Sequence, residues 1–292
     1  MSITSEVMSP PQQRRYDGAM ERQASVGSLL RDWRQRRRMS QLELAIEAEV
    51  STRHLSFVET GRARPSRSLL LHLGELLELP LRERNRMLLA GGYSPEYPEH
   101  RLSEPALANA LDAVRRLLDA HDPYPALAVD RHWNLLLANP AAQRLMQGVA
   151  PELLHPRPNV LRLTLHPDGL ASAIIDLDSW RRHLLARLRR LLAQTDDPEL
   201  AALHDELSTY PPPSGESPPA LDPAQIGPDP LATPHPDIVL PLRLRSPAGE
   251  LALFATLTVF GTPTDITLSE LAIESFFPAD PETAERLRQL AR

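Results

Sequence analysis

The stretch Ser51–Gly61, "STRHLSFVETG", has the residue types and spacing of a short helix with one polar face. At helical spacing, Leu55 and Val58 would face a core. The opposite side would carry Ser51, Thr52, Arg53 and Ser56. A short helix with a polar start fits the major groove of DNA, where an arginine can read guanine through O6 and N7. The sequence therefore predicts a recognition helix in which Arg53 reads a base.

Side chains around this helix are expected to contact the DNA backbone. Gln41 can donate its amide to a phosphate, and arginines that follow the recognition helix can reach phosphates as well. These arginines are Arg62, Arg64 and Arg67. Phe57 lies one turn from Arg53 and would either contact a thymine methyl group or pack in the core. The sequence leaves both possibilities open.

Five helices are expected between Val26 and Ala90, because apolar residues recur there at helical spacing. Ser40 and Glu43 form a capping box that starts the second helix. Ala45 is small enough to let two helices cross closely. This order of cap, small residue, sharp joint and polar helix favours a helix-turn-helix unit over a general helical bundle with solvated arginines.

The charge along the chain is uneven. The net charge is −6 over 292 residues, but residues 1–98 sum to +3 and residues 99–292 sum to −9. Within residues 26–67, nine arginines stand against five acidic residues. This asymmetry indicates a polyanionic partner for the front of the chain.

The domain boundaries follow from composition. Residues 1–24 are polar and are expected to form a disordered lead. The run Gly91–His100 contains Gly, Pro and Tyr without a period and marks a boundary. Residues 210–236 hold ten prolines and predict an extended or disordered loop. The expected domains are a helix-turn-helix domain at 25–94, a second domain at 104–280 and a C-terminal helix at 281–292.

The second domain is predicted to be α+β. Alternation and turn residues give strands at Ala126–Val129, Trp133–Ala138, Ile238–Arg245, Glu250–Phe260 and Asp265–Phe277. Helices are expected at Glu104–His121, from Pro140 onward, and at Asn159–Leu165, Ser179–Ala193 and Pro198–Leu207. The order strands, helices, strands favours one antiparallel sheet with helices on one face. That is the layout of a PAS-like domain, which encloses a pocket between sheet and helices.

Candidates to line this pocket alternate along strands or lie on helices that would cover them. The strand candidates are Trp133, Leu135, Leu137, Phe254, Thr256, Thr258 and Phe276. The helix candidates are Leu145, Met146, Trp180 and Leu184. Any single one of them is more often ordinary core than pocket lining. A ligand with a carboxylate head would need a cation or backbone N–H donors. The candidate cations are Arg144, Arg181 and Arg182, and the sequence does not choose among them.

Longer stretches resemble a known family. "SQLELAIEAEVSTRHLSFVETGRARPS" resembles the xenobiotic-response-element type of repressor DNA-binding domain. "TRHLSFVETGR" and "RERNRMLLAGGYSP" resemble one branch of it, the MmyB-like regulators. "ALAVDRHWNLLLANPAAQRL" and "LFATLTVFGTPTDITLSELAIESFFP" are similar to the second domain of that branch. The resemblance implies a five-helix DNA-binding domain and a PAS-like domain that holds a fatty acid or similar apolar small molecule.

Other classes of function have less support in the sequence. It contains no HExxH, GxSxG, Walker or GxGxxG pattern, and its histidines are scattered, so we expect neither an enzyme nor a metal site. No cofactor is expected apart from a bound fatty acid as ligand. The basic amphipathic stretch Trp180–Gln194 would suit an anionic lipid surface, but such helices more often cover a core. With no apolar run long enough to span a membrane, no membrane partner is expected.

The resulting expectation is a cytoplasmic, ligand-responsive regulator of transcription that binds a double-stranded DNA operator. Cysteine is absent, which suits a reducing compartment. One short recognition helix reads few bases, so a homodimer on a repeated or palindromic operator is expected. A second domain used for dimerisation or partner binding, without a ligand, remains the alternative.

Overall fold

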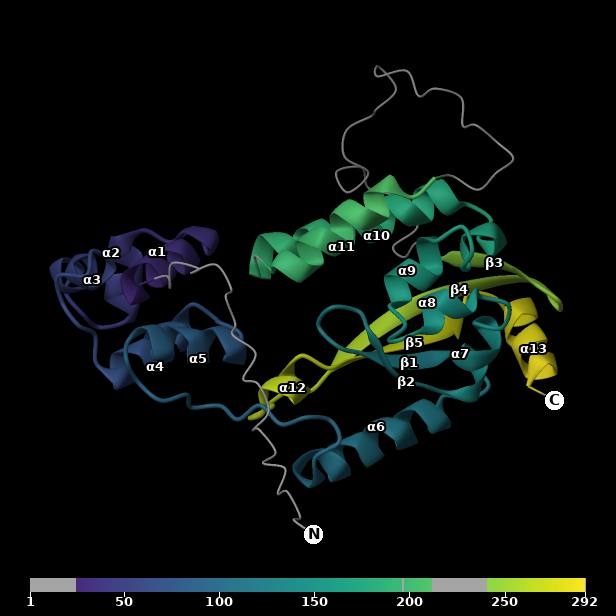
Figure 1. The fold of residues 1–292 in the computed structure, drawn as a ribbon, viewed down its shortest axis with the longest axis horizontal. Coiled ribbons are helices and arrows are strands. Elements are labelled where there is room, and N and C mark those ends of the chain that lie inside the picture. The colour runs from purple at the N-terminus through teal and green to yellow at the C-terminus, as the bar shows by residue number, and fades with distance from the viewer. Residues whose placement is uncertain (1–24, 196, 212–240, 292) are drawn as a thin grey trace, which may run out of the picture. The chain divides into compact units, whose positions relative to one another are not determined.

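The computed structural model describes residues 25–195, 197–211 and 241–291 (Figure 1). The chain divides into two compact units. One comprises Met1–Leu77 with Arg86–Ser94, and the other comprises Glu78–Asn85 with Pro95–Arg292. The predicted disordered lead at 1–24 and nearly all of the predicted Pro-rich loop at 210–236 lie outside the described residues.

The five predicted helices are all present; the first four belong to the first unit, and the fifth is divided between the two units after Asn85. They are α1 (Val26–Arg36), α2 (Gln41–Glu47), α3 (Thr52–Glu59), α4 (Arg67–Leu76) and α5 (Leu81–Ala90). Serine side chains cap the first four of these helices by accepting a hydrogen bond from a backbone N–H; these are Ser25, Ser40, Ser51 and Ser66. Leu30, Leu44 and Leu55 are fully buried and join the first three helices in one core.

Several helices of the first unit end in a left-handed residue that is not glycine. Arg38 follows α1 with φ 58°, Glu49 follows α2 with φ 54°, and Glu78 follows α4 with φ 49°. After α2, the N–H of Val50 donates to the carbonyl oxygen of Ala45 at 3.0 Å. This is the hydrogen bond of a Schellman helix end. Glu49 therefore makes the sharp joint between α2 and α3.

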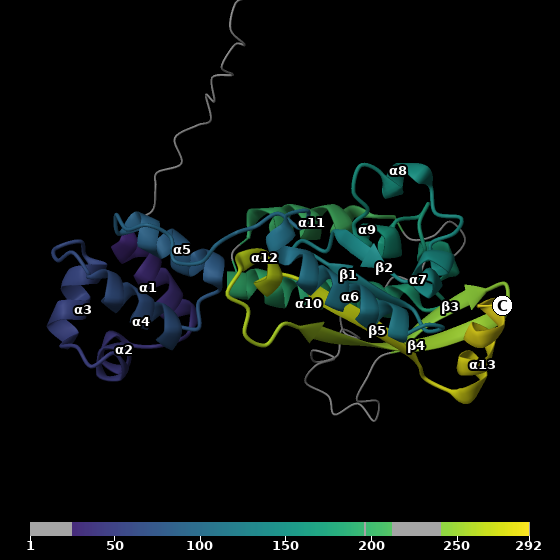
Figure 2. The same cartoon turned by 90° about the horizontal axis from the view of Figure 1, so that it is seen from below.

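The second unit is built on a five-stranded antiparallel sheet (Figure 2). Its strands are β1 (Ala126–Val129), β2 (Leu135–Ala138), β3 (Leu242–Ser246), β4 (Gly249–Val259) and β5 (Ala272–Pro278). They lie in the order β2-β1-β5-β4-β3. This sheet with its helices is the α+β, PAS-like architecture that the sequence predicts.

Helices cover both faces of the sheet. On one face, Leu184 and Leu188 of α10 (Leu177–Thr195) join the core cluster that also holds Leu127 and Leu253. On the other face, Val114 of α6 (Ala108–Ala120) packs in a separate cluster with residues of β1 and β5. The expectation of helices on one face is therefore wrong, because the helix that precedes β1 returns across the back of the sheet.

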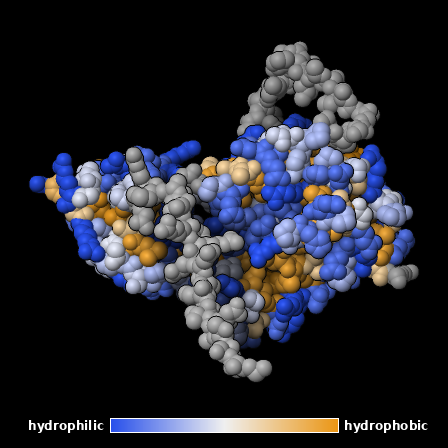
Figure 3. Space-filling model, in the orientation of Figure 1, coloured by the Kyte–Doolittle hydropathy of each residue, from blue (hydrophilic) through white to orange (hydrophobic). Residues whose placement is uncertain are grey.

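The remaining elements include α11 (Pro198–Thr209), whose buried leucines join the same core cluster as α10, and several short helices. The others are η1 (Pro105–Leu107), α7 (Pro140–Leu145), α8 (Pro151–Leu154), α9 (Val160–Leu165), η2 (Ala171–Ala173), α12 (Ile266–Ser269) and α13 (Pro281–Leu290). Most of the surface in the view of Figure 3 is hydrophilic, with a hydrophobic area exposed on the second unit. No helix among the described residues is long and apolar enough to cross a membrane.

The last predicted strand begins later in the structure than expected. Residues Asp265–Phe277 were expected to form one strand, but Asp265 caps α12 by accepting from the N–H of Leu268 at 3.1 Å. A side-chain cap competes with extended backbone, so β5 begins only at Ala272. The start of the expected strand Ile238–Arg245 lies outside the described residues.

Candidate functional site

Helix α3 presents the surface that the sequence assigned to DNA. Leu55 and Val58 are fully buried, whereas Arg53 is exposed. Ser51 is the N-cap and accepts from the N–H of His54 at 3.1 Å. The remaining predicted contact residues of the helix are half-buried; these are Thr52, Ser56 and Phe57. The polar face that was predicted for this helix is thus available to a partner.

The predicted arginines have different surroundings. The guanidinium of Arg53 lies 5.2 Å from the centre of the Phe57 ring, which orients it by a cation–π contact. Arg62 is exposed in the turn after α3. Arg64 donates to the carbonyl oxygen of Gly91 at 3.2 Å and lies over the Tyr93 ring. Arg67 is the first residue of α4 and is half-buried.

Gln41, predicted to contact a phosphate, makes a hydrogen bond within the first unit. Its amide donates to the carboxylate of Glu59 at 2.7 Å. The same carboxylate accepts from Arg34 Nε at 2.7 Å and from Arg34 Nη2 at 3.0 Å. Glu59 is buried, and burial by itself would raise its pKa. The hydrogen bonds from Arg34 and Gln41 outweigh this effect and hold the pKa of Glu59 below its ordinary value.

Glu59 and Gly27 were not singled out from the sequence. An acidic residue in the last turn of a helix opposes the helix dipole, and this placement was the available sign that Glu59 has a partner. A Cβ at Gly27 would lie 2.5 Å from the carbonyl oxygen of Val58 and 2.6 Å from that of Glu59. Gly27 therefore lets α1 approach the end of α3 at backbone distance.

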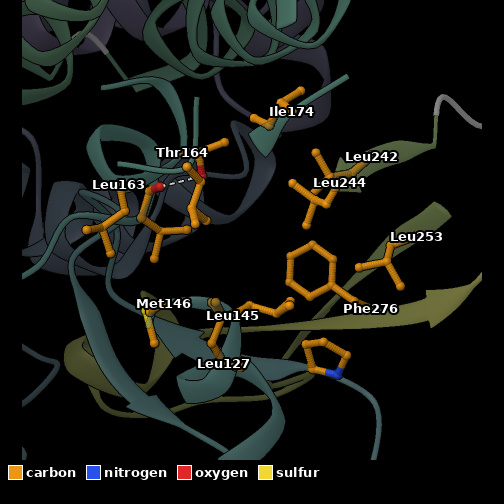
Figure 4. A pocket seen from close by; sticks show the side chains of 14 residues that line it. Leu127, Leu145, Met146, Leu163, Thr164, Ile174, Leu242, Leu244, Leu253 and Phe276 are labelled. Atoms are coloured by element: carbon orange, nitrogen blue, oxygen red, sulfur yellow. Dashed lines mark hydrogen bonds between the residues drawn. The ribbon is translucent and has the colours of Figure 1, made fainter. Parts of the chain in front are cut away.

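The second unit contains a cavity between the sheet and the helices on its α9 side (Figure 4). Its volume is about 60 Å³. The lining residues are Pro125, Leu127, Ala142, Leu145, Met146, Val160, Leu163, Thr164, Leu170, Ile174, Leu242, Leu244, Leu253 and Phe276. Thr164 has the one polar side chain among them, and its hydroxyl donates to the carbonyl oxygen of Val160 at 2.7 Å. The wall therefore offers apolar contacts and no unsatisfied hydroxyl.

Three of the predicted pocket residues line this cavity, namely Leu145, Met146 and Phe276. Trp133 and Leu184 are buried in the same core cluster without lining the cavity, and Leu135 and Trp180 pack against that cluster. Leu137 packs against the cluster on the α6 face instead. The candidates at the end of α7 and the candidate in β5 therefore meet at the cavity, whereas the candidates in β2 do not line it.

The β4 candidates occupy the opposite face from the cavity. Phe254 stacks on Phe277 with ring centres 5.3 Å apart. Thr256 and Thr258 share its face, because side chains alternate along a strand. Leu253, one position earlier, lines the cavity. The sequence "ELALFATLTVF" is apolar in both alternating phases, so periodicity alone does not identify the inner face.

The three arginines considered for an acidic ligand group are engaged elsewhere. Arg181 donates to the carbonyl oxygens of Leu207, Ser208 and Tyr210. Arg182 contacts Asp178 and Ser179 of its own helix, and Arg144 lies 3.5 Å from Asp122. Among the described residues, no group of three histidine or acidic side chains has the geometry to hold a metal ion.

Comparison with known proteins agrees with these two units. Residues 111–290 match the family described as the MmyB-like transcription regulator ligand binding domain, and residues 25–87 match a helix-turn-helix domain. No curated protein matches the chain.

Among solved structures, the chain is similar to one described as an RNA-binding Light-Oxygen-Voltage receptor, with 14% identity and a TM-score of 0.23. The alignment covers 91% of this chain and 62% of that one. The family assignment therefore rests on the two domain matches, of which the first spans more than half of the chain. The chain belongs to the family of MmyB-like transcription regulators, with a helix-turn-helix DNA-binding domain followed by a ligand-binding domain.

Proposed function

We propose that this regulator responds to a fatty-acid-like or other apolar small molecule that binds in the cavity of the second unit. The observation that carries the proposal is the composition of the cavity wall, with thirteen apolar residues and one threonine. Apolar ligands are held by burial of their surface, at roughly 25 cal/mol per Å². A wall of this kind selects against small polar metabolites, because their polar groups would be desolvated without a partner.

The volume of the cavity bears on the mechanism. An apolar cavity on the order of 150 Å³ is needed to take a molecule the size of benzene, whereas this one measures about 60 Å³. A chain-like ligand therefore requires a wider form of the site. A ligand that binds only the wider form shifts the population toward it, which is the differential affinity that regulation needs.

The first unit would read the operator. In this proposal Arg53 contacts a base and Arg62 contacts a phosphate; the exposure of both side chains supports it. One recognition helix gives too little discrimination for a single genomic site, so we propose that the protein acts as a cytoplasmic homodimer on two half-sites. Ligand binding would then change how well the two recognition helices fit their half-sites together.

The test has two steps. Extraction of the purified protein with organic solvent, followed by mass spectrometry, should release a stoichiometric fatty acid or another apolar compound. That compound, added back in increasing amounts, should change the affinity of the protein for its operator. A protein that releases nothing, and whose operator binding does not respond to acyl compounds of several lengths, would contradict the proposal.

The small volume also favours a second candidate function. A packed domain that serves dimerisation or partner binding alone would show a cavity of this size without any ligand. In that case the oligomeric state would depend on the second unit, while operator binding would be indifferent to every apolar compound.

A further inference from the structure

Arg187 of α10 and Glu274 of β5 form an ion pair beside the cavity. Glu274 lies directly opposite Leu127 of β1, and Leu127 lines the cavity. Phe276, which also lines it, stands two positions further along β5. Two positions along a strand return to the same face after about 6.8 Å. The ion pair is therefore next to the β1–β5 end of the apolar wall.

Glu274 is buried and Arg187 is half-buried, and a single hydrogen bond joins them. Arg187 Nη1 lies 3.2 Å from Glu274 Oε1, and the side chain of Glu274 is 8% exposed. By comparison, Arg162 holds Glu206 through two hydrogen bonds of 2.7 Å. A guanidinium carries five N–H donors, whereas the described residues accept a single hydrogen bond from Arg187. Donors of Arg187 remain for the oxygen atoms of another group.

Glu274 is a counter-ion of Arg187 that can become protonated and neutral. Its burial raises its pKa above the ordinary value, and the charge and hydrogen bond of Arg187 offset this only in part. Buried ion pairs contribute little net stability, because desolvation opposes the attraction. A second anion on Arg187 would let Glu274 become neutral and release the guanidinium.

Arg187 also makes a cation–π contact with Trp133. The Cζ atom of Arg187 lies 4.4 Å from the centre of the Trp133 ring, a close cation–π contact. Trp133 is buried and has φ 66°, which is a strained conformation for a bulky residue. Strain of this kind persists where the surroundings fix it, and it clusters at ligand sites. The guanidinium is thus oriented before any ligand arrives.

We propose that Arg187 binds the anionic head group of the apolar ligand, and that Glu274 is the counter-ion that this head group displaces. The inference rests on the proposed function, since it needs an apolar chain in the cavity. The chain would extend past Leu127 and Phe276, while its head group stays on α10 beside Trp133. Arg187 would then distinguish an acid from a neutral molecule of equal length.

The test compares decanoate with 1-decanol, which share a chain length and differ in the head group. Binding of each probe to the full chain is measured by calorimetry for the wild type, Arg187→Met and Glu274→Gln. Arg182→Gln is the matched control, because Arg182 is on the same helix and its hydrogen bonds to described residues are with Asp178 and Ser179 of that helix. Thermal unfolding of each variant confirms that it is folded.

Arg187→Met should weaken decanoate binding at least about tenfold, the effect of losing a charge-assisted hydrogen bond. It should leave decanol binding unchanged. Glu274→Gln should tighten decanoate binding, because the competing carboxylate is gone. If the ion pair is purely structural, each variant should change the binding of decanoate and of decanol alike, either weakening both or leaving both unchanged.

The outcomes also separate this inference from the proposed function. If decanol and decanoate bind the wild type equally and Arg187→Met changes neither, the head-group assignment is overturned while the apolar site stands. If neither probe binds the wild type, both are overturned for ligands of this length.

Discussion

The carboxylate of Glu59, in the last turn of α3, holds the guanidinium of Arg34 in α1 through hydrogen bonds of 2.7 and 3.0 Å. Gln41 at the start of α2 donates to the same carboxylate. The side chain of Glu59 therefore joins α1 and α2 to α3. Because the amide of Gln41 donates to Glu59, this hydrogen bond fixes the orientation from which the amide could donate to a phosphate.

The Glu59 cluster predicts a specific dependence of stability on pH. The pKa of Glu59 is lower in the folded protein than in the unfolded chain. Its contribution is therefore fully present above the unfolded pKa, about 4.3, and is lost as the pH falls through the folded pKa. Glu59→Gln should cost about 3 kcal/mol at pH 7, because it leaves the Arg34 charge buried without its partner.

Urea unfolding at pH 7 and pH 3.5 measures this effect. The difference in unfolding free energy between wild type and Glu59→Gln should shrink at the lower pH. Because both proteins are compared at the same pH, the contributions of their other acidic residues cancel. An equal difference at both pH values would show that Glu59 stabilises the domain by packing instead of by charge.

Gly27→Ala should destabilise the first unit. The added methyl group would meet backbone oxygens of α3, which cannot turn away as a side chain can. We expect a loss of roughly 1–3 kcal/mol together with weaker operator binding, since the end of the recognition helix must shift. Gly261→Ala is the control, because nothing lies within 4 Å of a Cβ there. Equal unfolding midpoints for the two variants would refute the close approach.

Arg53 and Arg62 should differ in how they affect operator binding. Arg53→Ala is expected to cost roughly 1–3 kcal/mol of discrimination at one base pair. Arg62→Ala should weaken binding to all sequences alike and lower the salt slope by about 1. Titrations with single-base operator variants at several salt concentrations distinguish the two. A uniform loss for Arg53→Ala would assign it to a phosphate.

Ala142→Leu should block the cavity. Ala142 is buried in α7 and lines the cavity, so a larger side chain there would occupy space that a ligand needs. Binding of decanol and decanoate should fall by the same factor, at least about tenfold, whereas Gln143→Leu on the exposed side of α7 should change neither. Equal ligand binding by Ala142→Leu would place the ligand elsewhere.

Much of the fold follows from local sequence signals. The serine caps and helical spacing locate the helices of the first unit, and β1 begins and ends where it was expected, since turn residues follow Val129. The error at Asp265 arose because a side-chain cap, not periodicity, decides between helix and strand there. The return of α6 behind the sheet depends on tertiary packing, which no local pattern reports.

The sites were less predictable than the elements. Exposure of α3 and of Arg53 follows from helical periodicity. The partner of Gln41 does not, because Glu59 lies 18 residues away and meets it only through the crossing of the helices. The inner face of β4 was ambiguous because Leu253 and Phe254 are both apolar. The ion pair of Arg187 and Glu274 joins residues 87 positions apart, with no pattern to link them.

The left-handed residues at the helix ends bear on the evolution of the recognition helix. Arg38, Glu49 and Glu78 adopt a backbone conformation that costs an L-residue roughly 1–2 kcal/mol relative to glycine. A change to glycine at Arg38 or Glu49 would therefore remove this cost without touching the surface of α3. Such a change would offset the cost of new side chains in α3. The DNA-binding unit has room to acquire a different operator preference while it stays folded.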